Sequence, residues 1–132
     1  MSDVGVTPSS APNPDRPGPP QGTWRNQHGS NLTLSADGEG GLAGSYRAAR
    51  GAFAGGTYPV RGSYDPRPTG ASSVVAFVVE WSEAHTVTVW SGQYFSGSKT
   101  LRATWLMTVE TGETDDWKST FVGHDVFLYV SD

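Results

Sequence analysis

The chain has no cysteine among its 132 residues. A disulfide framework is therefore excluded, and packing and hydrogen bonding must hold the fold. No apolar run reaches the roughly 18 residues that a membrane-spanning helix needs, so we expect no membrane partner. The formal net charge is −4 and the nine lysines and arginines form no basic stripe, which argues against a nucleic acid or an anionic membrane as partner.

Groupings that carry catalysis are also missing from the sequence. No nucleophile–base pair, metal-ligand cluster or phosphate-binding loop is visible, so we expect neither an enzyme nor a cofactor. His124 and Asp125 are neighbours, but adjacent strand residues point to opposite faces and cannot act on one substrate. The first residues lack a signal-peptide pattern; we expect the mature form of a secreted protein, although a cytosolic protein would share this feature.

Six of the nine prolines lie between Pro8 and Pro20, where the only large apolar side chains nearby are Val4 and Val6. Such a segment cannot bury enough apolar surface to offset the entropy lost on ordering. We therefore predict a flexible Pro-rich arm over residues 1–21, with docking on a neighbouring subunit as the alternative. One folded domain is expected over residues 22–132.

Seventeen glycines and five each of Trp, Tyr and Phe indicate β-structure with many tight turns. Alternation of apolar and polar residues predicts eight strands, near 23–26, 31–35, 41–47, 57–64, 72–81, 85–94, 99–109 and 119–129. Because the links are short, consecutive strands should pair antiparallel. An up-and-down meander of eight strands closes into a barrel, which removes both sheet edges, so we predict an all-β, eight-stranded antiparallel barrel.

Four tryptophans, Trp81, Trp90, Trp105 and Trp117, lie in or beside the later strands. Those within strands fall on faces that we predict to point inward. Large flat indoles converging inside a small barrel make a cage for a rigid, mostly apolar small molecule.

Asp125 shares the predicted inward face of the last strand with Phe121 and Phe127. A buried carboxylate costs several kcal/mol unless a group donates to it. The donor is either within the protein, Asn26 or an indole N–H, or it is an N–H of a bound ligand.

The predicted outer face is unusually apolar. It carries Val87, Val89, Leu106 and Val122. On a barrel without a membrane signature such a face favours contact between subunits, the alternative being scattered surface valines.

Short motifs follow one another along the chain in a fixed order. They are Gly22-Thr23-Trp24 with Asn26-Gln27 and Gly29-Ser30, then Gly44-Ser45-Tyr46, Trp90-Ser91-Gly92-Gln93-Tyr94, Trp105-Leu106, and Trp117-Lys118-Ser119-Thr120 with Val122-Gly123-His124-Asp125. In this order and spacing they resemble the avidin and streptavidin family, on the streptavidin-like side, from Gly22 to about Phe127. The resemblance implies a barrel that binds biotin at one open end.

The resemblance also implies a role for each matching position. In the family the ureido oxygen of biotin accepts three hydrogen bonds, here from Asn26, Ser30 and Tyr46, and a carboxylate, here Asp125, accepts one from a ureido N–H. The resemblance further implies that Thr88 contacts the ring sulfur, and that Thr86 and the backbone N–H near Ala52 contact the valerate carboxylate. The aromatic wall would consist of Trp81, Trp90 and Trp105, with Met107 in place of a family leucine.

Assembly is implied in the same way. In tetrameric relatives the tryptophan matching Trp117 reaches over the ligand of a neighbouring subunit. Gln93, Val122 and His124 match positions at subunit interfaces, and the apolar Leu106 belongs to the same surface. We therefore expect a homotetramer; for His124 the alternative is an ordinary surface histidine.

Two departures from the family pattern bear on affinity. Ala48 stands where the family has a hydroxyl that contacts the second ureido N–H, and losing one neutral hydrogen bond costs roughly 0.5–1.5 kcal/mol. The loop Ser82-Glu83-Ala84 is shorter than in streptavidin-like chains. We expect biotin to bind more weakly than in the tightest relatives.

Two other kinds of binding protein remain as alternatives. A lipocalin-like carrier of another apolar ligand also has eight strands, but it would not need Asn26, Ser30, Tyr46 and Asp125 directed at one end. A carbohydrate-binding module would instead present its tryptophans outward in a row.

Overall fold

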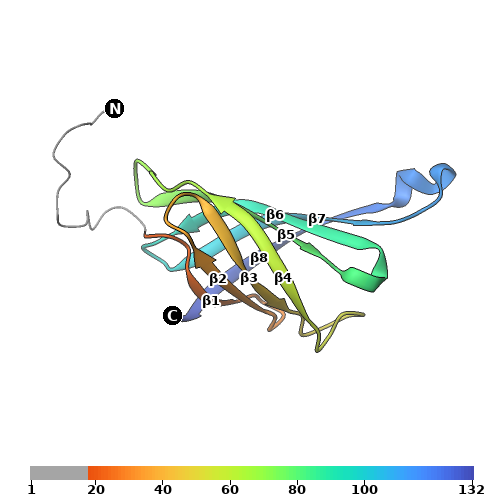
Figure 1. The fold of residues 1–132 in the computed structure, drawn as a ribbon, viewed down its shortest axis with the longest axis horizontal. Helices are drawn as coiled ribbons and strands as arrows, with labels where there is room; N and C mark the ends of the chain where they lie inside the picture. The colour runs from red at the N-terminus through yellow and green to blue at the C-terminus, as the bar shows by residue number, and fades with distance from the viewer. Residues whose placement is uncertain (1–17) are drawn as a thin grey trace.

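A computed structural model describes residues 18–132, so the predicted arm over residues 1–21 lies almost entirely outside the described residues. Eight antiparallel strands form a closed barrel in which each pairs with the next and the last pairs with the first (Figure 1). The elements are β1 (Gly22–Arg25), β2 (Asn31–Ala36), β3 (Gly41–Arg47), β4 (Thr57–Tyr64), β5 (Ser72–Glu80), η1 (Ser82–Ala84), β6 (Thr86–Phe95), β7 (Thr100–Val109), η2 (Glu113–Lys118) and β8 (Thr120–Ser131). The predicted fold class is confirmed. The bounds of β3 and β4 match the prediction, and the ends of the other strands are shifted by one or two residues.

The core is the barrel interior, as β5 illustrates. Val75, Phe77 and Val79 are buried, whereas Val74 and Val78 on the other side of the strand are exposed. This period of two is what a strand with one face on a core and one on its outside requires.

One end of the barrel is filled by aromatic side chains. The indole of Trp24 is almost fully buried and packs edge-on against Tyr94 and Tyr129, at centroid distances of 5.5 and 5.4 Å. Edge-to-face contact is the favoured aromatic geometry, so these rings close the barrel here.

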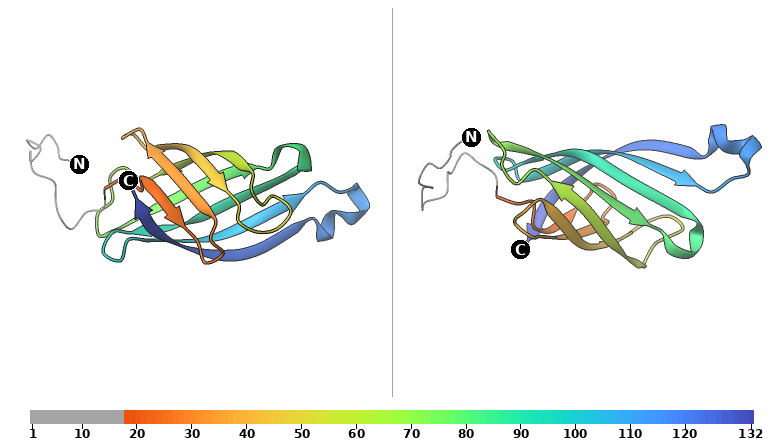
Figure 2. Two further views of the ribbon diagram at one scale, coloured as in Figure 1. Left: turned by 90° about the horizontal axis from the view of Figure 1, so that it is seen from below. Right: turned by 45° about the horizontal axis from the view of Figure 1, so that its top comes forward.

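At the other end the β7–β8 hairpin extends beyond the barrel, with η2 at its tip (Figure 2). Phe121 pairs with Met107 in this extension and is 52% exposed. The prediction that Phe121 shares the buried face of Asp125 and Phe127 is therefore wrong. Its alternation is in phase with theirs, but it lies on the part of the β7–β8 hairpin that extends beyond the barrel, so half of its side chain stays exposed.

On the outside, an apolar row crosses four strands. Val78 pairs with Val89, Val89 with Leu106, and Leu106 with Val122. All four side chains are exposed, Val122 most of all at 68%. No helix among the described residues is both long and apolar enough to span a membrane.

Candidate functional site

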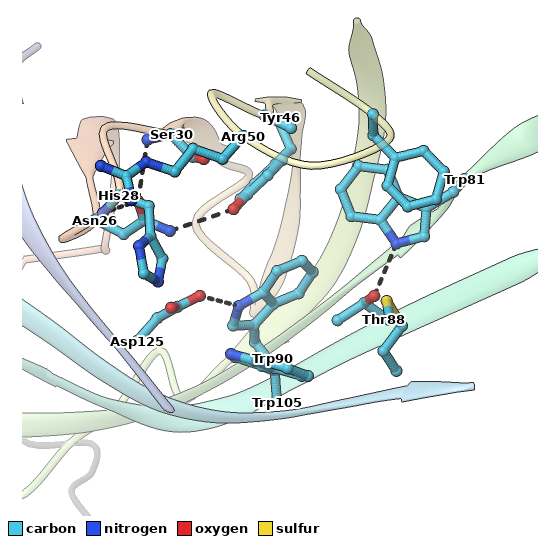
Figure 3. A pocket seen from close by; sticks show the side chains of 13 residues that line it. Asn26, His28, Ser30, Tyr46, Arg50, Trp81, Thr88, Trp90, Trp105 and Asp125 are labelled. Carbon is cyan, nitrogen blue, oxygen red and sulfur yellow. Dashed lines mark hydrogen bonds between the residues drawn. The ribbon is translucent and has the colours of Figure 1, made fainter. Parts of the chain in front are cut away.

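A cavity of about 220 Å³ opens at the end of the barrel that carries the β1–β2 and β3–β4 connections (Figure 3). It is lined by Asn26, His28, Ser30, Tyr46, Ala48, Arg50, Phe53, Trp81, Thr88, Trp90, Trp105, Met107 and Asp125. Nine of the predicted ligand-binding residues are thus brought together, from strands and connections distant in the sequence.

The amide of Asn26 is oriented by the turn that follows β1. Its Oδ1 accepts hydrogen bonds from the backbone N–H groups of His28 and Ser30, both at 3.0 Å. Because the oxygen is held on the turn, Nδ2 is directed to the cavity side, where it donates to the Tyr46 hydroxyl at 3.3 Å. An amide nitrogen carries two protons, so one remains for a ligand.

Ser30 and Tyr46 are prepared to donate as well. The Oγ of Ser30 accepts the backbone N–H of Ala49 at 3.0 Å, which leaves its own proton for another partner. Burial raises the pKa of the Tyr46 hydroxyl, so the phenol keeps its proton at neutral pH. Three buried donors at one end of a cavity suit a single carbonyl oxygen.

The buried carboxylate of Asp125 has a donor for each oxygen. Oδ2 accepts from the Trp90 indole at 2.9 Å, and Oδ1 accepts from Nε2 of Gln27 at 2.8 Å. The indole alternative is therefore confirmed, whereas Asn26 donates to Tyr46 instead. Each oxygen has a further lone pair, so Asp125 can accept from a ligand N–H without losing these partners.

Gln27 was not foreseen from the sequence as the second donor. Its Nε2 also donates to the backbone oxygen of His124, at 3.1 Å, and its Oε1 accepts from the backbone N–H of Val126, at 3.1 Å. These bonds join the β1–β2 turn to β8 and fix the side chain beside Asp125. They depend on a contact between residues 98 positions apart, which no local pattern reports.

The aromatic walls are held by stacking and by the indole hydrogen bonds of Trp81 and Trp90. Trp90 lines the cavity and stacks on Phe77 at a centroid distance of 5.0 Å. Phe77 supports the indole from the side that faces away from the cavity. Trp81 donates its indole N–H to the Thr88 hydroxyl at 2.7 Å. Trp105 lies over Gly123, its cross-strand partner, where any side chain would clash with the indole.

A further aromatic side chain, Phe53, comes from the connection between β3 and β4. Its ring stacks on Trp81 at 4.5 Å, nearly parallel, and lines the cavity. Phe53 was not anticipated from the sequence. The available signal was a lone large apolar residue within the Gly- and Ala-rich stretch 48–56, which has no alternation by which to assign a face.

Two predicted contact residues do not line the cavity. Ala52 is exposed on the β3–β4 connection. Thr86 is buried, but its hydroxyl donates to the backbone oxygen of Ala84 at 2.9 Å, within the short β5–β6 connection. Their contact with a ligand carboxylate stays a prediction.

The predicted interface residues all lie outside the cavity and are exposed. Trp117 is 80% exposed in η2, and Leu106 and Val122 belong to the apolar row on the barrel surface. Gln93 and His124 are exposed on β6 and β8.

Comparison with known proteins agrees with this architecture. The family model described as "Avidin family" matches residues 15–130. Avidin of Gallus gallus is 31% identical over 113 residues, which cover 80% of this chain and 74% of the relative. Avidin-related proteins 7 and 3 of the same organism are each 32% identical over the same length and shares. The chain belongs to the avidin family.

Proposed function

We propose that the cavity binds biotin with high affinity and without catalysis. The observation that carries the proposal is the gathering of three buried donors, Asn26, Ser30 and Tyr46, beside the buried carboxylate of Asp125 at one end of an aromatic cavity. A cyclic urea is complementary to this set, because its carbonyl oxygen accepts and its N–H groups donate.

The two halves of such a contact strengthen one another. Donors at the ureido oxygen draw electron density from the ring nitrogens, which makes their N–H groups better donors to Asp125. Since the donors and the carboxylate are already oriented by protein partners, little ordering is left for the binding step.

The cavity walls complement the remainder of biotin. Trp81, Trp90 and Trp105 provide flat apolar surface for the fused rings. The Thr88 hydroxyl accepts from Trp81, so its own proton is free for the ring sulfur. Thr86 and the backbone near Ala52 remain the proposed partners of the valerate carboxylate.

A lipocalin-like carrier is the less favoured alternative. A purely apolar ligand would cover Asn26, Ser30 and Tyr46 without accepting their protons, and a buried donor left unpaired costs about 1–3 kcal/mol. The polar end of the cavity would therefore oppose such a ligand.

The protein is further proposed to act as a secreted homotetramer. The exposed row Val78, Val89, Leu106 and Val122 supplies apolar surface for a subunit contact, with His124 and Gln93 nearby on the same strands. Trp117, on the projecting hairpin, is the residue proposed to reach a neighbouring cavity.

Titration with biotin tests the proposal directly, with tryptophan fluorescence as the readout because three indoles line the cavity. We expect quenching at one biotin per chain, with a dissociation constant well below micromolar. Palmitate serves as the apolar control, and Ser91→Ala, on the exposed side of β6, serves as the control variant. A protein that ignores micromolar biotin, or that binds palmitate equally well, does not have this function.

A further inference from the structure

The β3–β4 connection brings two arginines close to the cavity, and they are used differently. Arg47 donates from Nη1 to the backbone oxygen of Gly55 at 3.0 Å, which joins the end of β3 to the far part of the connection. Arg50 lines the cavity instead. Within residues 18–132 the ion pairs are His85–Glu110 and Lys118–Asp115, so the Arg50 guanidinium has no carboxylate partner there.

The backbone that carries Arg50 is held in place on both sides. The N–H of Gly55 donates to Ala48 at 3.0 Å, closing the connection at its base. Gly51 has a φ of 82°, a left-handed conformation that turns the chain directly after Arg50. Phe53, stacked on Trp81, anchors the far side of the connection. Arg50 therefore starts from a fixed point above the cavity.

Figure 3 shows where the charge lies. The side chain of Arg50 extends along the rim toward His28, on the side of the cavity formed by Asn26 and Ser30. Both rim side chains are exposed, so the guanidinium can turn toward a group at the cavity mouth.

The other fixed charge of the cavity does not neutralise Arg50. The oxygens of Asp125 accept from Trp90 and Gln27 in the cavity wall, and this carboxylate forms no ion pair with Arg50 among the described residues. The chain as a whole carries a net charge of −4, which opposes the approach of an anion. A cation on the rim is thus the local feature that favours an anionic ligand.

We propose that Arg50 is a specificity-determining residue that makes the cavity prefer ligands with a free carboxylate beyond their ring system over the corresponding esters and amides. The inference rests on the proposed function, because it concerns the part of biotin that points out of the cavity. A guanidinium attracts a carboxylate by charge and by its fork of N–H donors, and a neutral ester receives neither benefit.

The test compares biotin with biotin methyl ester, which has the same rings but no charge, in the full-length protein. In 50 mM salt the acid should bind about twofold to fivefold more tightly than the ester, within the range expected for one solvent-exposed ion pair. Arg50→Gln should abolish this preference, and Arg50→Lys, which keeps the charge, should retain most of it. Raising the salt to 0.5 M should reduce the preference in the unsubstituted protein but not in Arg50→Gln.

The outcomes separate the two proposals. If both ligands bind Arg50→Gln with an unchanged ratio, or if the substitution weakens both equally, Arg50 does not select the carboxylate and this inference is overturned alone. If neither ligand binds the unsubstituted protein, the proposed function fails and takes the inference with it.

Discussion

The two ends of the barrel use the same kind of side chain in opposite ways. At the closed end Trp24 packs edge-on between Tyr94 and Tyr129, so its ring fills space. At the open end the indole N–H groups of Trp81 and Trp90 are hydrogen-bonded to Thr88 and Asp125, respectively. Both rings line the cavity and leave its interior open. By contrast, the indole nitrogen of Trp24 is buried and has no hydrogen-bond partner among the described residues.

The difference teaches how one barrel combines stability with binding. Rings that interdigitate contribute packing and leave no room for a ligand. Rings held at their edges by hydrogen bonds keep their positions without filling the space between them, so the cavity is formed before a ligand arrives. Substitutions at the two ends should therefore affect different measurements.

The largest effect is expected for Trp24→Ala, which should lower the free energy of unfolding by about 3–5 kcal/mol because it empties a packed site. Trp105→Ala, at the half-buried cavity wall, should cost much less stability but should weaken biotin binding strongly. Denaturant unfolding at one fixed protein concentration, together with titration of the folded fraction, checks the pair. Trp24→Phe provides a milder variant if the alanine variant does not fold. Equal losses of stability would remove the distinction between the two ends.

Asp125→Ala should raise the dissociation constant of biotin roughly 10- to 150-fold, since a hydrogen bond to a charged group contributes about 1.5–3 kcal/mol. Competition against a slowly dissociating biotin conjugate measures the change. Asp125→Asn keeps the shape of the side chain and removes the charge, so it should give an intermediate loss. A wild-type affinity in Asp125→Ala would mean that the open end binds its ligand without this carboxylate.

Trp117→Lys should weaken both biotin binding and assembly. Each free energy should fall by about 2 kcal/mol, because tryptophan anchors at interfaces contribute about this much. Analytical ultracentrifugation reports the assembly, and titration of the same samples reports the affinity. Thr114, in the same short helix η2, offers the control variant Thr114→Lys. If Trp117→Lys changes neither quantity, the open end is completed within one chain and the inter-subunit role of Trp117 is wrong.

The smallest expected effect is a gain. Ala48→Ser places a hydroxyl beside Tyr46 in the cavity and should strengthen biotin binding by about 0.5–1.5 kcal/mol, the contribution of one neutral hydrogen bond. Ala49→Ser is the matched control, because Ala49 is exposed and does not line the cavity. Isothermal competition titration resolves a change of this size. No gain at position 48 would show that the missing hydroxyl does not limit affinity.

The eight strands and their faces were predictable because alternation reports burial one residue at a time. Val75, Phe77 and Val79 illustrate this, and the predicted bounds of β3 and β4 match the structure. At Phe121 alternation no longer reports burial. Its place in the alternation is the same as that of Asp125, but its burial depends on whether an opposite wall exists at that height of the barrel.

Within the candidate site, the residues that belong to recognisable motifs or strands were anticipated, and those of the irregular β3–β4 connection were not. Asn26, Tyr46, Trp90 and Asp125 were named from motifs and alternation, and all line the cavity. Phe53 and Arg50 come from an irregular connection whose path depends on its hydrogen bonds to itself and on contact with Trp81. Gln27 acquires its role only through closure of β8 against the β1–β2 turn.

By itself the sequence determined the period and the number of strands, because both depend on local spacing. Its motifs, through their resemblance to a family, indicated most of the side chains that line the candidate site. Only the tertiary structure decided that Gln27 supports Asp125, that Phe53 extends the aromatic wall and that Arg50 stands at its rim. Those relations are set when the barrel closes and the connections pack over its open end, since closure brings together groups that no local interaction joins.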